Sequence, residues 1–522
     1  MQAAYGCAVA PRVRRIRGGE SAEVRRLRLA MLEDAPEAFH SRYEDEAAQD
    51  DAFWEGRTLT GALAARVATF VAADGDRHFG SVTGLRPDDD EPALLVAMWV
   101  EPSARRAGWG AQLVEAVCRW ARRRGSSSIE LDVRELNAAA IDLYRRCGFE
   151  VFSGPAPAPG NPELMELRMR RRLDVPPDGP VVQRLQRTHA GLAAGLAALP
   201  GADLHSLLLH ETRRRAAGVT PAAVLRARLS DQLAVPVPID AVALQRAGLA
   251  ALEVAEGFEP VTLSPVAPAG VNTALGGVDQ NLSVATVRGS EVLSDPTTAL
   301  ALEVALRRRA GDRSPALCWV GRVLRTQPFG AGNYQHFGLF ALVSAGLREP
   351  GHGFALRALA AHLRTYLTLA DRVGAGPVVV ETSDTAWLAV RCREAGVDLT
   401  DLVDQERLGA GEPERLLHEA GIDLPRFTTD PPAGSELLER VATTVYADLA
   451  AAFPTASLGF RPGRLFGGSY YTGLLLNIDR DVPDGRLSVV DGGATDWTQR
   501  LLSNRRERLF VSGIGLDRLV RP

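Results

Sequence analysis

The sequence predicts two fold classes in succession, α/β in the N-terminal part of the chain and α+β in the C-terminal part. Two observations lead to this prediction. Within residues 11–173, short apolar runs typical of strands alternate with segments whose apolar residues recur at helical spacing. Residues 181–250 have mainly helical spacing, and strand-like runs dominate the remainder. The 522 residues would fill about three domains of ordinary size.

The composition is that of an ordinary globular protein, with 46% apolar and 24% charged residues. The 60 basic and 64 acidic residues give a net charge of −4, which provides no overall attraction to nucleic acid. All of these basic residues are arginine, so chemistry that needs a lysine nucleophile or a Schiff base is excluded. The five cysteines form no CxxC pair, and the sequence therefore predicts a reduced chain without a metal site.

Membrane attachment is not expected. The longest apolar run, ALLVAMWV at 93–100, is far shorter than the roughly 20 residues that cross a bilayer. The first residues carry too short an apolar stretch for a secretory signal, and their arginines follow that stretch. We therefore expect a cytoplasmic protein.

The elements of the first part follow from local patterns. Residues 21–47 have apolar residues at helical spacing and predict a helix. Residues 68–85 predict two strands about the turn Asp74-Gly75-Asp76. The almost continuous apolar run at 93–100 predicts a strand buried on both faces. It leads into residues 103–125, which predict a glycine-containing loop that opens a helix.

That loop carries the first sign of chemistry. Gly108 and Gly110 would let successive backbone N–H groups gather around an anion at the positive end of the helix. Arg105 and Arg106 add positive charge beside it. A pyrophosphate suits such a loop better than a neutral ligand. The alternative is a glycine-rich turn with solvated arginines, because a GxG pattern alone is weak.

Two ordered motifs together resemble the GNAT acetyltransferase superfamily. The first is Arg105-x-x-Gly108-x-Gly110, and the second runs from Asn137 through Tyr144 to Gly148-Phe149. The resemblance implies a mixed central sheet flanked by helices, over residues 11–173. It also implies acetyl-CoA as the acyl donor and a small-molecule amine as the acceptor. The implied acetyl-CoA site comprises Val100, Arg105, Arg106, Ala107, Gly108, Trp109, Gly110, Ala111 and Asn137.

The resemblance further implies that Tyr144 protonates the departing thiolate, since a phenol with a pKa of ~10 is protonated at neutral pH. The alternative role for Tyr144 is helix packing. The strand at 93–100 offers no carboxylate that could act as the base. Glu91 and Glu101 are candidates for that role, and water is the alternative.

Prolines indicate where the first part of the chain ends. Residues 153–162 predict a proline-rich loop, and the following segment to residue 173 predicts the last strand of the first sheet. Residues 174–180 predict the interdomain linker, and residues 181–244 a mainly helical segment.

Three stretches within residues 245–522 resemble the catalytic domain of class II aminoacyl-tRNA synthetases, nearest to the histidyl branch. They are LCWVGRVLRTQPFGAGNYQHFGLFALVSAG at 317–346, GGSYYTGLLLNI with SVVDGGATDW at 467–497, and GIGLDRL at 513–519. The first of them resembles an antiparallel hairpin that carries Arg325. The resemblance implies an antiparallel sheet with helices and a site for ATP with Mg²⁺. In it, Arg325 would hold the α-phosphate and Arg518 would stack on adenine. The other implied ligand residues are Asp295, Tyr470, Tyr471 and Asp496.

Departures from the histidyl pattern bear on the ligand. Leu339 and Val343 stand where polar groups face the substrate, and Phe466 and Ala494 replace arginines. Ser469 stands in the place of an aspartate. A bound histidine would leave its ammonium desolvated and unpaired, which costs several kcal/mol. Histidine is therefore not the expected ligand.

Four residues follow Arg518, and we therefore expect no anticodon-binding domain like that of the synthetases. The regulatory subunit of ATP phosphoribosyltransferase, a relative of the same fold without catalytic activity, also lacks that domain. We therefore expect no stable tRNA binding, and tRNA charging is the least favoured function. A homodimer is expected, because residues 291–309 are apolar and class II folds pair through the corresponding helix and strand.

The sequence leaves two main hypotheses. In the first, an acetyl-CoA-dependent N-acetyltransferase is fused to a domain that binds or activates an amino-acid-like molecule with ATP, in specialised metabolism. In the second, the C-terminal half is a regulatory sensor without catalysis. ATP–pyrophosphate exchange would separate them.

Overall fold

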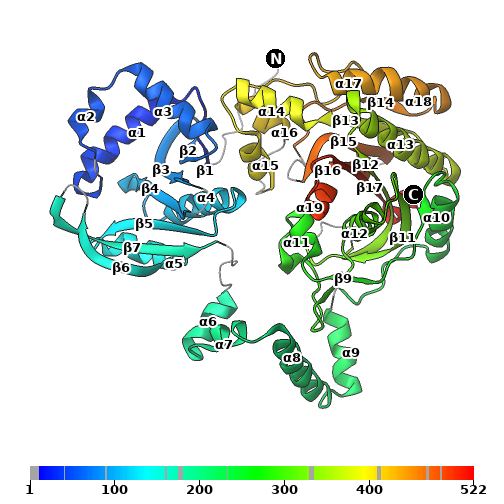
Figure 1. Cartoon of the computed structure of the whole chain (residues 1–522), viewed down its shortest axis with the longest axis horizontal. Coiled ribbons are helices and arrows are strands. Elements are labelled where there is room, and N and C mark those ends of the chain that lie inside the picture. The colour runs from blue at the N-terminus through cyan, green and yellow to red at the C-terminus, as the bar shows by residue number, and fades with distance from the viewer. Residues whose placement is uncertain are drawn as a thin grey trace, which may run out of the picture. The chain divides into compact units, whose positions relative to one another are not determined.

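The computed structural model describes residues 11–39, 41–88, 91–158, 161–173, 180–231, 233–327, 334–407, 413–465, 470–482 and 485–521. Phe466, Ser469 and most of the predicted linker at 174–180 lie outside these described residues. The chain forms two compact units (Figure 1). Unit 1 comprises Met1–Gly195 and Ala389–Ile422, and unit 2 comprises Leu196–Leu388 and Asp423–Pro522. The mixed class that the sequence predicts is confirmed.

Unit 1 is built on a mixed sheet of seven strands in the order β1-β2-β3-β4-β5-β7-β6. Its neighbours are antiparallel, except for the parallel pair β4 and β5. The strands are β1 (Arg12–Arg15), β2 (Val67–Asp74), β3 (Arg77–Leu85), β4 (Ala93–Val100), β5 (Ser128–Arg134), β6 (Glu150–Ala158) and β7 (Asn161–Arg172). The predicted strand pair about Asp74-Gly75-Asp76 is confirmed as β2 and β3.

Helices cover both faces of this sheet. In β2, Ala68, Phe70 and Ala72 pack in one core with α4 and α5. The alternating residues Val71 and Ala73 pack in another core with α1 and α3. This alternation follows from the two-residue repeat of a strand. The helices are α1 (Ser21–Asp34), α2 (Tyr43–Ala47), α3 (Asp51–Leu63), α4 (Trp109–Arg123) and α5 (Ala138–Arg146), with short 3₁₀ turns η1 (Pro36–Ala38) and η2 (Pro102–Ala104).

Two sequence expectations for this unit need correction. The helix expected over 21–47 ends at Asp34, because Pro36 cannot continue it, and α2 starts afresh at Tyr43. The proline-rich loop expected over 153–162 is largely strand, since β6 continues to Ala158. β6 is the edge strand of the sheet, where a proline without an N–H removes no central hydrogen bond. Its pairing with β7 shifts register three times.

Residues from far along the chain complete unit 1. α15 (Leu399–Arg407) and α16 (Pro413–Glu419) belong to the segment Ala389–Ile422. The buried Arg15 of β1 forms an ion pair with Asp398 at 2.8 Å. The amide of Gly18 donates to the carbonyl of Gly396 at 2.9 Å. Arg12 pairs with Glu419. This segment is therefore fastened to the first strand of the sheet.

Five helices follow the first sheet in sequence, as predicted for 181–250. They are α6 (Pro180–Thr188), α7 (Leu192–Ala197), α8 (Gly201–Ala216), α9 (Pro221–Ser230) and α10 (Ala241–Glu253). α10 packs Leu244, Ala247, Ala250 and Ala251 into the core of unit 2. None of the described residues of α7, α8 and α9 is buried.

Unit 2 is built on an eight-stranded sheet in the order β14-β13-β15-β16-β17-β12-β11-β8. It is antiparallel except for its two outermost pairs, β13 with β14 and β8 with β11. The strands are β8 (Glu259–Pro260), β11 (Ala316–Leu324), β12 (His336–Leu347), β13 (Val378–Asp384), β14 (Ser457–Phe460), β15 (Tyr471–Val482), β16 (Gly485–Thr495) and β17 (Glu507–Gly515), and a separate pair is β9 (Val266–Pro268) with β10 (Ser290–Val292). The hairpin expected around Arg325 is confirmed as β11 and β12.

This sheet is also covered on both faces. In β12, Phe340 and Leu342 pack in the core that contains α10 and α13. Leu339, Ala341 and Val343 pack on the opposite face with α11, α12 and α19. The helices are α11 (Val271–Gly276), α12 (Pro296–Arg309), α13 (Gly353–Val373), α17 (Glu436–Arg440), α18 (Ala447–Ala452), α19 (Trp497–Leu502) and α20 (Leu516–Leu519). The chain passes from unit 2 into unit 1 within α14 (Thr385–Glu394). No helix among the described residues is long and apolar enough to cross a bilayer.

Candidate functional site

The sheet of unit 1 opens between β4 and β5. These parallel strands pair only at their beginnings, where Ala93 faces Ile129 and Leu94 faces Glu130. On its other side, β4 carries one extra residue relative to β3, in a bulge at Ala97 and Met98. Ala97 has a left-handed backbone with φ of 52°. Beyond Leu94, β4 therefore presents an unpaired edge inside the sheet, which an extended ligand with amide groups can use as a partner.

The loop after β4 provides an anion site. Gly108 caps α4 with φ of 87°, and Arg106 is also left-handed with φ of 67°. In the described part of unit 1, the six amides from Arg106 to Ala111 have no backbone acceptor. A side chain on Gly108 would meet no atom within 4 Å, so there is open space in front of the loop. Consecutive free amides at the start of a fifteen-residue helix suit a phosphate group.

The two loop arginines differ in their contacts. Arg105 donates from Nε to the carbonyl of Val100 at 2.8 Å and pairs with Asp34. Asp34 also accepts from the indole of Trp99 at 2.8 Å, and this hydrogen bond together with Arg105 lowers the pKa of that carboxyl. Arg105 thus fixes the loop to the end of β4. Arg106 is exposed, as is Ala107.

The remaining loop residues have packing roles. Trp109 meets Phe79 edge to face at 5.2 Å between ring centroids. A side chain on Gly110 would lie 3.0 Å from the Leu143 side chain, so this glycine allows α4 and α5 to pack closely. Ala111 packs against the core of the same face. The sequence assigned both glycines to the anion. Gly108 has the left-handed backbone of the cap, and Gly110 combines a free amide with close packing against Leu143.

Asn137 and Tyr144 lie at the two ends of α5. The Asn137 side chain caps the helix, accepting from the amide of Ala140 at 3.1 Å. Tyr144 is buried, with its ring 5.8 Å from that of Phe149. Burial raises the pKa of Tyr144 above its ordinary value, so the phenol stays protonated at neutral pH. Glu101, a candidate base, is already paired with Arg77 at 2.8 Å.

In unit 2, some of the predicted ligand residues gather on the face of α12 and α19. Tyr470 stacks on Trp497 at 6.2 Å and contacts Tyr471 at 4.3 Å between ring centroids. Burial raises the pKa of Tyr470, the neighbouring Asp491 and Asp295 raise it further, and Arg325 opposes them. The pKa of Tyr470 thus responds to Asp295 and Arg325, two other predicted ligand residues.

The charged groups of this cluster also have protein partners. The Asp295 carboxylate caps α12, accepting from the Thr297 amide at 2.9 Å. Arg325 donates to the Ser294 carbonyl at 2.9 Å. Burial lowers the pKa of Arg518, and the nearby Arg521 and Arg325 lower it further. The approach of these arginines to one another is the arrangement that an anion would stabilise.

The carboxylate of Asp496 accepts from Arg500 one turn along α19 at 3.0 Å. Sequence reasoning missed Asp491, which accepts from the Tyr471 hydroxyl at 3.1 Å and pairs with the buried Arg464. Asp491 belongs to the glycine-rich stretch SVVDGG, which was the available signal. Leu339 and Val343 are buried in the apolar core of this face.

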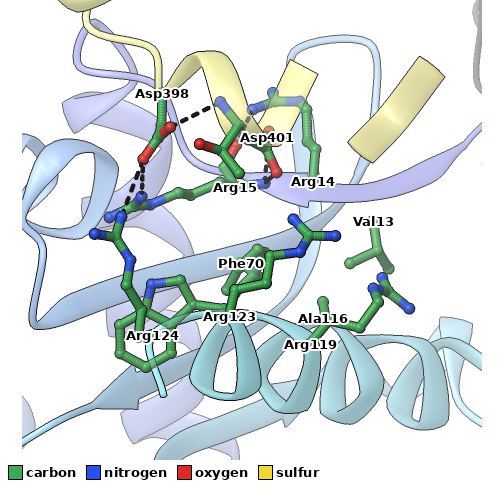
Figure 2. A pocket seen from close by; sticks show the side chains of 12 residues that line it. Val13, Arg14, Arg15, Phe70, Ala116, Arg119, Arg123, Arg124, Asp398 and Asp401 are labelled. Carbon is green, nitrogen blue, oxygen red and sulfur yellow. Dashed lines mark hydrogen bonds and ion pairs between the residues drawn. The ribbon is translucent and has the colours of Figure 1, made fainter. Parts of the chain in front are cut away.

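A pocket in unit 1 that the sequence did not indicate lies between β1, α4 and α15 (Figure 2). Five arginines and two aspartates line it: Arg14, Arg15, Arg119, Arg123, Arg124, Asp398 and Asp401. Asp398 joins Arg15 at 2.8 Å and Arg124 at 3.6 Å. Arg15 also donates to the carbonyls of Gly61, Ala64 and Val67, each at 2.8 Å. These contacts give the pocket a structural role in holding the segment of α15.

Among the described residues, no three His, Cys, Asp or Glu side chains lie close enough to share a metal ion. The features described above offer two kinds of ligand contact. One is the open edge of β4 with its loop of free amides, and the other is the arginine cluster of unit 2.

Comparison with known proteins finds relatives of unit 1. The model of the acetyltransferase (GNAT) family matches residues 28–149. The [ribosomal protein bS18]-alanine N-acetyltransferase of Escherichia coli K12 is 30% identical over 117 residues, which are 22% of this chain and 74% of that protein. An aminoglycoside N(6')-acetyltransferase type 1 of Klebsiella aerogenes is 36% identical over 98 residues, which are 17% of this chain. The chain spans only 64% of the length of that aminoglycoside enzyme.

Among solved structures, a histidyl-tRNA synthetase from Nostoc sp. PCC 7120 is similar, with a TM-score of 0.43 and 16% identity over 56% of this chain and 73% of that chain. Residues 28–149 contain both the loop of free amides and the helix of Tyr144. Through this region, the chain belongs to the acetyltransferase (GNAT) family.

Proposed function

We propose that unit 1 transfers an acetyl group from acetyl-CoA to the nitrogen of a small amine. The observation that carries this proposal is the loop of six free amides directly beside the open edge of β4. A ligand with a pyrophosphate at one end and an amide-containing arm fits both features at once. Membership in the acetyltransferase family supports the same donor.

The residues would divide the work of binding. The amides from Arg106 to Ala111 would hold the pyrophosphate, with Arg106 adding charge from the exposed side. The backbone of β4 beyond Leu94 would pair with the amides of the extended arm. Asn137 would shape this site through its cap on α5.

Acetyl-CoA supplies an activated acyl group to this site. The amine nitrogen forms a bond to the acyl carbon, and the carbon–sulfur bond breaks. Tyr144 would give its proton to the departing thiolate, since burial keeps the phenol protonated. The proton lost by the amine would pass to water, because Glu101 is paired with Arg77 and Glu91 lies exposed before β4 begins.

For unit 2 we infer a binding site for an amino-acid-like molecule. Arg325 and Arg518 would hold an anionic group, such as the phosphates of ATP with Mg²⁺. The alternative is a regulatory site without catalysis. It is favoured by the carboxylate of Asp295, which is already used as a helix cap. ATP-dependent pyrophosphate exchange separates the two, because only the catalytic form produces it.

The experiment for unit 1 is direct. The full chain is incubated with acetyl-CoA and a set of amines that includes aminoglycosides, peptides with N-terminal alanine and free amino acids. Mass spectrometry should detect acetylation of one class, and release of free CoA should match it. Binding of acetyl-CoA is measured separately by calorimetry. An enzyme that neither binds acetyl-CoA nor acetylates any amine would contradict the proposal.

A further inference from the structure

A second cavity of unit 1 lies among α1, α3 and the strands β2, β3 and β4. Its polar lining comes from Arg28, Arg57, Thr69, Ser81 and Thr83, and its apolar lining includes Leu27, Met31 and Val71. Ala97, at the bulge of β4, also lines it. The cavity has a volume of about 40 Å³. That is room for about three water molecules, or for a group of three heavy atoms.

Arg28 is unusual among the residues that line this cavity. It is only 8% exposed. Its Nε donates to Glu46 at 3.1 Å and its Nη2 at 2.8 Å, while its guanidinium lies over the ring of Phe39. Its Nη1 is buried and has no hydrogen-bond partner among the described residues. Buried guanidinium N–H groups are rarely left without an acceptor, so this atom marks a position where an acceptor is missing.

The charges around Arg28 do not balance. Glu46 is itself buried, and it also accepts from Arg57 at 3.0 Å. Burial alone would raise the pKa of Glu46, but the hydrogen bonds from Arg28 and the charge of Arg57 keep it below its ordinary value. One carboxylate therefore serves two guanidinium groups. The hydroxyls of Thr69 and Thr83 bond each other at 2.9 Å and add no charge. The cavity retains an excess of one positive charge.

We propose that this cavity is the acceptor site of the acetyltransferase and that the acceptor carries a carboxylate, which Arg28 binds through Nη1. The substrate class is thus an amine with a carboxylate, such as an amino acid. This inference rests on the proposed acetyl transfer. A carboxylate has three heavy atoms and one negative charge, which match the volume and the excess charge.

The position of the cavity connects it to the reaction. Ala97 lies in the β4 bulge, on the part of the strand that does not pair with β5. The same residue lines the cavity of Arg28. A molecule whose carboxylate contacts Arg28 can therefore extend toward the strand along which the acyl donor binds. The amine of the acceptor would lie at that end.

The test compares matched acceptors. The full chain receives acetyl-CoA with either the common amino acids or their carboxamides, and kcat and KM are measured for each pair. The amine of a carboxamide is less basic than that of the acid, so a larger fraction of it is unprotonated and reactive at neutral pH. A preference for the acid therefore cannot come from intrinsic reactivity. Wild type should favour the acids by about ten- to a hundredfold in kcat/KM, the scale of one charge-assisted hydrogen bond.

Variants then locate the preference. Arg28→Lys keeps the positive charge near Glu46 but removes the Nη1 group. It should raise KM for the acids and leave kcat and acetyl-CoA affinity unchanged. Arg57→Gln, at a side chain that is 36% exposed, should fold and should also raise KM for the acids. Arg26→Lys is the matched control on the same helix, outside the cavity and 42% exposed, and should keep the preference.

The outcomes are distinguishable. Acetylation of acids and carboxamides at equal rates would overturn the carboxylate site and leave the acetyltransferase intact. Retention of the acid preference by both Arg28→Lys and Arg57→Gln would also overturn it. Acetylation of other amines but of neither series would overturn the carboxylate site and leave the proposed function intact. An enzyme that neither binds acetyl-CoA nor acetylates any amine would be a failure of the proposed function itself.

Discussion

Tyr144 is the residue on which proton transfer to the thiolate would depend. Tyr144→Phe removes the hydroxyl and keeps the ring that packs beside Phe149. We expect acetyl-CoA affinity to be unchanged and kcat to fall by about ten- to a thousandfold, the scale of one general acid. Calorimetry and steady-state kinetics on the same preparation give both values. Equal kcat in the two proteins would leave Tyr144 with a packing role only.

The pH dependence follows from the direction of the Tyr144 shift. Burial raises the pKa of this phenol above its ordinary value of 10, so the acid form persists to higher pH than for a free tyrosine. The rate should therefore rise as the acceptor amine deprotonates and should not fall up to about pH 9. A fall in kcat between neutral pH and that value, without loss of structure, would assign the acid role to a different group.

A substitution of Gly108 tests the anion loop, and Gly125 at the other end of α4 provides the control. Gly108 and Gly125 stand at opposite ends of this helix, both have φ of 87°, and a side chain on either would meet nothing within 4 Å. Gly108→Glu places a negative charge before the free amides, and acetyl-CoA affinity should fall by at least about tenfold. Gly125→Glu carries the same strain and charge away from the loop, and calorimetry should show normal affinity.

The sequence predicts the loop better than the acceptor cavity, and the reason lies in sequence distance. The loop residues are consecutive, so their spacing alone indicates an anion site. Arg28 and Glu46 are 18 residues apart on different helices, and Thr83 comes from a strand. In α1, Arg28 stands beside two other arginines, the half-buried Arg25 and the exposed Arg26. Nothing local distinguishes it, because its burial arises only when α2 and α3 pack on the sheet.

At the scale of elements, the sequence predicts hairpins and helices whose signals are contiguous. The pairs β2–β3 and β11–β12 are examples. The bulge in β4 is different, because Ala97 and Met98 read as part of a continuous apolar strand. The extra residue becomes visible only in the register against β3. Similarly, prolines in β6 indicate a loop until the strand is known to lie at an edge.

The contact between Gly18 and Gly396 yields a prediction for the segment of α15. A side chain on Gly396, where φ is 72°, would lie 2.9 Å from the Gly18 backbone. Gly396→Ala combines left-handed strain with this overlap, and we expect unit 1 to lose about 2–5 kcal/mol of stability. Thermal unfolding with and without acetyl-CoA identifies the transition that belongs to unit 1.

Gly421→Ala is the control for that variant. Gly421 lies in the same segment with φ of 77°, and a side chain there would meet no atom within 4 Å. It should cost only the left-handed strain of roughly 1–2 kcal/mol. If the two variants unfold at the same temperature, the close approach of the two glycine backbones does not contribute to the stability of unit 1.

For the whole molecule, the homodimer stays a prediction. Its support from the apolar segment 291–309 is weakened. α12 was expected to expose apolar surface, but Leu300, Ala301 and Val304 are buried within unit 2. The helices α8 and α9 expose leucines and valines instead, with Leu229 75% exposed. Such apolar helices are stable only when covered. Light scattering at micromolar concentration should give twice the mass of 56.0 kDa, and a monomeric mass would contradict the dimer.

Domain organisation could be predicted only in part from the sequence. The boundaries at 173/174 and 244/245 depend on composition and prolines, and they stay predictions. That residues 389–422 belong to the compact unit of the acetyltransferase could not be foreseen. Their sequence is an unremarkable run of short helices, and their place depends on ion pairs such as Arg15 with Asp398, 383 positions apart.

This long-range completion of unit 1 has a consequence for how the protein is made. A ribosome releases β1 early, yet the partners of Arg12, Arg15 and Gly18 emerge only after some 400 residues. At ~5–20 residues per second, the first strand waits tens of seconds for its last contacts. During synthesis, the nascent acetyltransferase sheet therefore has an edge that only the later segment covers, and exposed edges recruit other chains. Chaperone dependence should accordingly be greatest before residue 422 has left the ribosome.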